Sequence, residues 1–399
     1  MRVRVGAMTP EIRPLRDGEA AEAARHRAVS FGKTADDRLV ERMGERIAAG
    51  EVWGAADGAR LLSSCTVTRV DHWFGGRPVA CQHIGAVSVP PEHRGRGVAS
   101  ALMRAVARNG AREGIGLSLL FPATTRLYRR LGWEHAGSYT RYRLAAWDAM
   151  PAGPRPSAMR VAQGDADWTA IRGCFVRAGA RDSGVGARPE RTWEGLKEAA
   201  YHYALDGEEE GTVDAYVLFD HGHHPDDWRY TLEIRDWAAV TPDGLRAVVG
   251  LVASHGSLGK DARFVASQPD PWSLLIGEQD VTIDGALNWM ARGLDPAQAI
   301  AQRGFPPGLS VSVTLTLTDA LLPQAAGPWL LEVDGGRGTL KPADRADVHL
   351  DARAFGPLFT GFRDPAQLAL GGLAGGPPQP LALLAAAFAG PPPYLIDFF

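Results

Sequence analysis

One short segment, residues 87–102, joins the end of a strand to the start of a helix through a basic glycine turn. Residues 87–89 alternate apolar and polar side chains, as a buried strand end does. The two prolines at 90–91 then stop ladder pairing, because neither can donate a backbone N–H group. From Val98 apolar residues recur every four positions, which predicts a helix.

The turn itself predicts an anion site. Gly95 and Gly97 leave backbone N–H groups unobstructed by side chains, and a helix N-terminus adds free N–H groups and partial positive charge. Arg94 and Arg96 add two full charges. The segment therefore suits a pyrophosphate. The alternative is an ordinary strand-to-helix turn with surface arginines.

The ligand class follows from the spacing of the motif. The turn lacks the Gly-Lys-Ser/Thr of a P-loop and the three glycines of a dinucleotide fingerprint. It carries Arg94-x-x-Gly97-x-Ala99, which resembles the acetyl-CoA loop of the GNAT acyltransferases. That resemblance implies acetyl-CoA as the co-substrate.

A tyrosine downstream fits the same resemblance. Residues 127–133 resemble the Tyr-x-x-x-Gly-Phe segment of GNAT enzymes, in which the tyrosine faces the thioester sulfur. Tyr128 can protonate a departing thiolate, because a phenol with a pKa of about 10 stays protonated at neutral pH. The alternative is that Tyr128 only packs beneath its helix.

Composition bounds the class of protein. The 399 residues are 45% hydrophobic and 22% charged, with a formal net charge of −3 and no run of basic residues, which argues against a nucleic-acid partner. Cys65, Cys81 and Cys174 are too few and too scattered for a disulfide framework or a zinc site. No secretory segment and no apolar span of about 18 residues is found, so we expect a soluble, cytoplasmic protein without a membrane partner.

The chain divides into three parts in an α/β (α+β) arrangement. A proline-rich linker begins at residue 151, after which residues 159–162 repeat the pattern of residues 12–15. We therefore expect domains at residues 1–150 and 151–288, and a third at 289–399.

The second unit is predicted to be a degenerate copy. Residues 238–242 repeat the pattern of residues 87–91 and precede another helix. Its loop lacks the Arg-x-x-Gly-x-Ala motif, and Asp243 at the helix start would repel a phosphate.

The third part is a mixture of strands and helices with an unusual end. Residues 309–318 alternate strictly between apolar and hydroxyl-bearing side chains, which predicts a half-buried strand. The final residues, 391–399, are aromatic and stiffened by prolines, whereas a free tail is normally polar. We therefore expect this tail to be docked.

Taken together, the basic loop, the duplicated unit and the aromatic tail resemble the Eis-type (enhanced intracellular survival) acetyltransferases. Those proteins contain two GNAT-like domains followed by a sterol-carrier-like domain. The resemblance implies Tyr128 as general acid, the α-carboxylate of Phe399 as general base, broad primary-amine acceptors including aminoglycosides, and a homohexamer. The CoA contacts it implies lie at Val87, Ser88, Val89, Arg94, Gly95, Arg96, Gly97, Val98, Ala99, Ser100, Ala123 and Thr124. Ala123 and Thr124 depart from the Ser-Glu usual in the family.

The base assignment also has a chemical argument. Acetyl transfer needs a neutral amine, whereas a primary amine is mostly protonated at neutral pH. A chain-end carboxyl group has a reference pKa of about 3.3–3.7, so it is ionised and can accept the proton. The alternative is that Phe399 is merely tucked against an apolar neighbour.

Other candidates are weaker. His221, His223 and His224 with Asp226 and Asp227 look like metal ligands, but we expect an exposed hairpin loop there and no metal. The acidic residues that could attract a lysine-like or polyamine-like acceptor are Asp36, Asp37, Glu41, Glu208, Glu209 and Glu210. The competing function is a non-catalytic scaffold that binds an acyl-CoA or a lipid, although GNAT units that serve purely as a scaffold have no need for Arg94 and Arg96.

Overall fold

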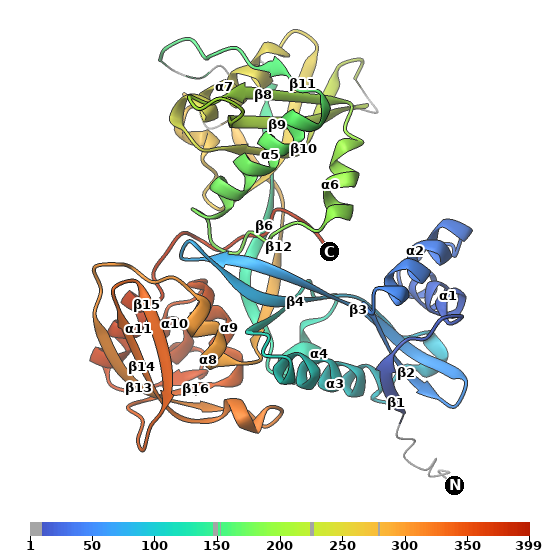
Figure 1. The fold of residues 1–399 in the computed structure, drawn as a ribbon, viewed down its shortest axis with the longest axis vertical. Coiled ribbons are helices and arrows are strands. Elements are labelled where there is room, and N and C mark those ends of the chain that lie inside the picture. The colour runs from blue at the N-terminus through green and yellow to red at the C-terminus, as the bar shows by residue number, and fades with distance from the viewer. Residues whose placement is uncertain (1–9, 147–150, 152, 224–226, 278–279) are drawn as a thin grey trace.

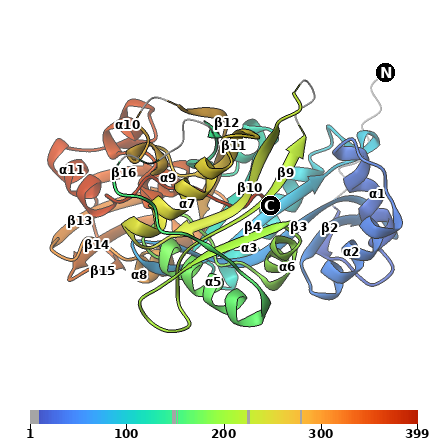
Figure 2. The same cartoon turned by 90° about the horizontal axis from the view of Figure 1, so that it is seen from above.

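The computed structural model describes residues 10–146, 151, 153–223, 227–277 and 280–399 (Figure 1). Helices and strands are mixed along the chain, as the α/β prediction requires. Three lobes surround the point at which the chain ends, and the view from above places that end near the middle of the molecule (Figure 2). Within these residues no helix has the length and apolar character needed to span a bilayer.

The first unit contains the strand-and-helix order predicted from the sequence. Its elements are β1 (Glu11–Pro14), α1 (Ala20–Ser30), α2 (Asp37–Ala48), β2 (Val52–Asp57), β3 (Arg60–Phe74), β4 (Arg77–Ser88), the 3-10 turn η1 (Pro91–His93), α3 (Val98–Arg112), β5 (Leu117–Leu120), α4 (Thr125–Arg129) and β6 (Glu134–Ala145).

The second unit repeats this order. Its elements are β7 (Arg160–Val161), α5 (Gly164–Gly179), α6 (Glu190–Lys197), β8 (Tyr201–Asp206), β9 (Val213–His223), β10 (Tyr230–Ala239), α7 (Pro242–Ser254), β11 (Gly259–Ala266), η3 (Trp272–Leu274) and β12 (Val281–Gly293).

The two units share one sheet and exchange their last strands. The strand order is β1-β2-β3-β4-β5-β12-β6-β11-β10-β9-β8-β7. Strand β6 of the first unit pairs with β11 of the second, and β12 of the second pairs with β5 of the first. The two halves of the sheet are therefore mirror copies in strand order, which confirms the internal repeat. Strand β12 also continues through Trp289, so residues 289–293 lie in this sheet.

The C-terminal unit is built on a separate five-stranded sheet with the order β15-β14-β13-β16-β17. Its elements are α8 (Pro296–Gln302), β13 (Val311–Thr318), η4 (Pro323–Ala325), β14 (Gly327–Asp334), β15 (Arg337–Pro342), β16 (Val348–Asp351), α9 (Ala352–Thr360), α10 (Pro365–Leu370), β17 (Ala374–Gly375) and α11 (Pro378–Ala387). Strand β13 buries its apolar side chains and leaves its hydroxyl-bearing ones exposed or half-buried, as the alternation predicted.

The aromatic tail is docked between the units, as expected. Leu395 donates its backbone N–H to the carbonyl of Ser138 on β6, and Ser138 donates to the carbonyl of Pro393, both at 2.9–3.0 Å. Tyr394 is buried, and its hydroxyl donates to Asp182 of the second unit at 2.9 Å. The tail thus crosses the central sheet and ends against the first unit (Figure 1).

Candidate active site

Strands β4 and β5 separate to form an opening in the sheet. They pair in parallel only from Cys81 to His83. Beyond His83, β4 continues to Ser88 while β5 ends at Leu120, and Ala86 has a positive φ of 48° that marks an irregularity in β4. After His83 the backbone of β4 is therefore not paired with β5, and Val87, Ser88 and Val89 follow along this edge. The backbone N–H and C=O groups of this edge could hydrogen-bond to an extended pantetheine arm.

The predicted anion loop lies at the end of this opening. Gly95 and Gly97 have φ values of 73° and 77°, a left-handed conformation that favours glycine. Gly97 caps α3 without a side-chain hydrogen bond, so the first N–H groups of the helix, at Val98, Ala99 and Ser100, have no side-chain cap. Arg96 is exposed beside them, and Arg94 folds back to donate to the carbonyl of Val89 at 3.0 Å. These residues fit a pyrophosphate.

The equivalent region of the second unit is filled by its own side chains. Strands β10 and β11 also separate, after Glu233, but Trp237 spans them by donating to the carbonyl of Val265 at 2.9 Å. The fully buried Trp272 packs against Trp237 with ring centroids 5.3 Å apart.

The helix start of the second unit is likewise occupied. The hydroxyl of Thr241 caps α7 by accepting from the N–H of Gly244 at 3.1 Å. Asp243 lies in the first turn, where it accepts a hydrogen bond from Ser157 at 2.7 Å. An anion would have to displace these groups.

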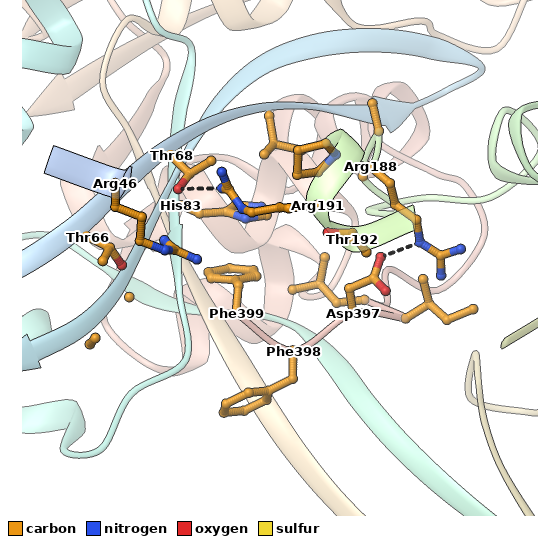
Figure 3. Close-up of a pocket in the computed structure, with 18 of the residues that line it drawn as sticks. Arg46, Thr66, Thr68, His83, Arg188, Arg191, Thr192, Asp397, Phe398 and Phe399 are labelled. Atoms are coloured by element: carbon orange, nitrogen blue, oxygen red, sulfur yellow. Dashed lines mark hydrogen bonds and ion pairs between the residues drawn. The ribbon is translucent and has the colours of Figure 1, made fainter. Parts of the chain in front are cut away.

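The chain end lies in a cavity of about 570 Å³ on the opposite side of β4 from the core that holds Tyr128. The cavity is lined by α1, α2, β3, β4, the loop before α6, the first turn of α6 and the tail (Figure 3). The ring of Phe399 stacks on His83, with centroids 3.5 Å apart and an interplanar angle of 8°. A side chain added at Gly85 would place its Cβ 3.5 Å from the terminal carbon of Phe399, so this carboxyl group approaches the backbone of β4 closely.

A buried ion-pair network anchors the tail. Asp397 accepts from Arg188 at 2.8 Å, and the same guanidinium binds Asp236 at 2.5 and 2.9 Å. Tyr216 donates its hydroxyl to Asp236 at 2.6 Å. Because Arg188, Tyr216 and Asp236 belong to the second unit, that unit positions the end of the chain in the first unit's cavity.

Two histidines line the same cavity in neutral form. His72 contacts the carbonyl of Gly184 through Nδ1 at 2.6 Å and His83 through Nε2 at 2.5 Å. Since a carbonyl can only accept, Nδ1 of His72 carries the proton and Nε2 of His83 is the donor to Nε2 of His72. Burial lowers the pKa of His72 to about 4, and burial together with His72 and Arg191 lowers the pKa of His83 well below its usual value.

Tyr128 lies on α4 and is only 5% exposed. It belongs to the same buried cluster as Cys65 on β3 and Ile84 on β4, and its ring packs edge-on against Trp133 at 6.4 Å. Burial, and less strongly Cys65, raises the pKa of Tyr128 to about 12. Ile84 and Gly85 are consecutive strand residues and face opposite ways, so Tyr128 and the Phe399 carboxyl group approach β4 from opposite sides.

Several sequence candidates lie elsewhere. Ala123 and Thr124 are exposed in the loop before α4, where Thr124 precedes the first helical residue. The cavity lining includes none of the acidic candidates: Asp36 caps α2, and residues 208–210 are an exposed turn of the second unit. Of the histidine-rich loop, residues 224–226 lie outside the described residues, and no cluster of potential metal ligands occurs among those described.

Helix α2 and its contribution to the cavity were missed from the sequence. The signal was present: Asp36 accepts from the N–H of Leu39 as an N-cap, and Leu39, Met43 and Ile47 form a buried stripe at four-residue spacing. That stripe turns Arg46 toward the cavity (Figure 3). His83, Arg188 and Arg191 carry no local signal that links them to this site.

Comparisons with known proteins agree with this geometry. Models of the acetyltransferase (GNAT) domain match residues 11–136 and 184–292, and a sterol carrier protein domain model matches residues 296–396. The two GNAT matches confirm the duplicated unit, and the third confirms the predicted C-terminal domain type. GNAT domains use acetyl-CoA as co-substrate, which agrees with the open loop of the first unit.

Relatives extend over nearly the whole chain. An uncharacterized N-acetyltransferase of Streptomyces griseus is 26% identical over 391 residues, covering 89% of this chain and 90% of its own. Eis1 from Mycobacterium abscessus shares the fold, with a TM-score of 0.81 at 21% identity over 98% of this chain and all of its own.

A GCN5-related N-acetyltransferase from Kribbella flavida is closer in sequence than either of these two. It is 31% identical, with a TM-score of 0.87 and coverage of 98% of both chains. The two GNAT domains and this full-length similarity, together with the open glycine loop, show that the chain belongs to the GCN5-related N-acetyltransferase (GNAT) family and is an acyltransferase.

Proposed function

We propose that this protein is an Eis-type N-acetyltransferase that moves the acetyl group of acetyl-CoA to a primary amine. The observation that carries the proposal is the approach of the Phe399 carboxyl group to Gly85, next to the opening between β4 and β5. An acyl group held along β4 would lie within reach of a base at this position. The cavity around Phe399 is then the acceptor site.

In this proposal the chain end acts as the general base. The amine nitrogen bonds to the thioester carbonyl carbon and gives its proton to the Phe399 carboxylate, directly or through water. The tail contacts at Ser138, Asp182 and Arg188 hold this carboxylate in place. A fixed base avoids the cost of ordering a flexible chain end during the reaction.

Tyr128 is the proposed general acid. As the carbon–sulfur bond breaks, the sulfur receives the phenol proton, and CoA leaves as the thiol. Burial keeps this phenol protonated at neutral pH, because it raises the pKa of Tyr128 to about 12. Its position across β4 from Phe399 separates the acid from the base.

The second unit is proposed to be silent toward CoA. Trp237 and Trp272 fill its strand opening, and Thr241 caps the helix that would face the pyrophosphate. The division into domains at 1–150, 151–288 and 289–399 stays part of this proposal, with the last strand of the second unit, β12, running on to Gly293. The homohexamer implied by the Eis-type resemblance and the cytoplasmic location expected from the sequence also stay part of it.

The loop of the first unit supplies a direct test of CoA binding. Arg96→Ala combined with Gly97→Val is expected to abolish acetyl-CoA binding in calorimetry, because a charge is lost and valine is strained at a φ of 77°. The wild type is expected to bind one acetyl-CoA per chain. A stoichiometry of two would show that the second unit is not silent.

A coupled assay separates the enzyme from the scaffold alternative. Purified protein is mixed with acetyl-CoA and a panel of lysine, polyamines, amino sugars and aminoglycosides, and thiol release is recorded with each acceptor. We expect acceptor-dependent release of CoA together with a rise in melting temperature on adding acetyl-CoA. A rise in melting temperature without turnover on any amine would favour the scaffold.

A further inference from the structure

The acceptor cavity carries more positive than negative charge. Its lining includes two carboxyl groups, those of Asp397 and of the chain end at Phe399. The cationic side chains of the lining are Arg27, Lys33, Arg46, Arg188 and Arg191. A polyamine or aminoglycoside, itself a polycation, would enter this cavity against that charge.

The ion pairs show which cations are already neutralised. Arg188 forms ion pairs with Asp236 and Asp397, as described above. Arg46 and Arg191 share one carboxylate, because Glu51 lies 3.7 Å from the former and 2.9 Å from the latter. Arg27 and Lys33 have no acidic partner among the residues that the structure describes.

Burial and neighbouring cations lower the pKa of two of these arginines. Burial, followed by Arg191, lowers the pKa of Arg46, and burial together with Arg42 lowers the pKa of Arg27. Guanidinium groups nevertheless stay charged at neutral pH. The planar donors of Arg46 and Arg191 suit a carboxylate or a phosphate, which they can bind with charge-assisted hydrogen bonds. Arg191 also donates to the hydroxyl of Thr68 at 3.2 Å, which fixes its direction (Figure 3).

We propose that the acceptor carries an oxyanion, a carboxylate or a phosphate, beside its primary amine, and that Arg46 and Arg191 bind this oxyanion. The inference rests on the proposed function, since it takes the cavity at Phe399 as the acceptor site. The same positive charge disfavours an ammonium group and so favours the neutral amine, which is the nucleophile. An acceptor of this class is therefore both held and activated by the cavity.

Matched pairs of acceptors test the inference. Lysine is cadaverine with an added carboxylate, and glucosamine 6-phosphate is glucosamine with an added phosphate. We expect kcat/KM to be at least about 10-fold higher for the anionic member of one or both pairs, because a charge-assisted contact is worth a factor of about 10 or more. The pair that shows the difference distinguishes a carboxylate from a phosphate. The preference is expected to fall as salt is raised, because exposed charges are screened.

Variants locate the effect. Arg46→Gln and Arg191→Gln are expected to raise KM for the anionic acceptor about 10-fold or more, and to change KM for the anion-free member of the pair much less. The matched control is Arg38→Gln, on the same helix α2 but exposed and outside the cavity lining. Melting curves and acetyl-CoA binding check that each variant is folded.

Two outcomes are distinguished by design. Faster turnover of cadaverine, glucosamine or kanamycin than of the anionic acceptors would overturn the inference and leave the transferase function standing. If no amine is acetylated, the proposed function fails. Calorimetry on the CoA complex then tests separately whether the cavity binds the anionic member of each acceptor pair more tightly. Binding of lysine or glucosamine 6-phosphate no tighter than that of its anion-free counterpart would then overturn the inference as well.

Discussion

Appending a few residues after Phe399 is expected to lower amine acetylation by at least about 10²-fold, the lower bound of what a general base contributes. The extension converts the terminal carboxylate into an amide, which cannot accept the proton. It also forces extra chain into the cavity beside Gly85. Acetyl-CoA binding and the melting temperature should stay close to those of the wild type, because the loop at 94–100 is untouched.

Two further changes at the chain end separate the effect of the carboxylate's position from that of the last side chain. Deleting Phe398 and Phe399 withdraws the terminus by about 3.3–3.6 Å per residue, so activity should be lost to a similar extent. Phe399→Ala should lose less, because its carboxylate survives and only the stacking on His83 is removed.

The measurement is steady-state acetylation of the same acceptor panel by each variant. The control is an equal extension at the N-terminus, because the first described strand, β1, is an edge strand of the shared sheet (Figure 1). Full activity of the C-terminally extended protein would show that the chain end is structural, and another base would be required.

Tyr128→Phe is expected to lower kcat by about 10²–10⁴-fold, the usual contribution of a general acid. Acetyl-CoA binding should be retained, since the change removes one hydroxyl and keeps the ring packed against Trp133. Because burial raises the pKa of Tyr128 to about 12, loss of its proton should not reduce wild-type activity below about pH 11.

A second buried tyrosine provides the matched control. Tyr142 on β6 is 4% exposed and donates its hydroxyl to the carbonyl of Ser267 at 3.0 Å, within the core of the second unit. Tyr142→Phe should cost about 1 kcal/mol of stability, the net value of one hydrogen bond, with little effect on kcat. If Tyr128→Phe behaves in the same way, Tyr128 is a core residue and the sulfur is protonated by another group.

Local patterns were sufficient to predict the parts of the site that lie within one segment. The sequence predicts the strand, the glycine turn and the helix around Gly95 and Gly97. It can do so because strand alternation, helical spacing and left-handed glycines depend only on neighbouring residues. The alternating strand β13, the helix that carries Tyr128 and the internal repeat were predicted for the same reason. The resemblance to the Eis-type acetyltransferases then indicated that the glycine turn and the helix that carries Tyr128 belong to one site.

The proposed acceptor cavity could be identified only from the tertiary structure. It combines Arg46 from α2, His83 from β4, Arg191 from α6 and the last residues of the tail, which are separated by up to about 350 positions in the chain. The exchange of β6 and β12 brings the second unit, with Arg188, against the first.

The same distinction applies to charge. The sequence analysis expected acidic residues near the acceptor, whereas arginines line the cavity that we propose for it, because a side chain's electrostatic role depends on which distant segments pack beside it. Composition and spacing determine local conformation. The packing of exchanged strands and a docked tail decides which charges meet in the cavity.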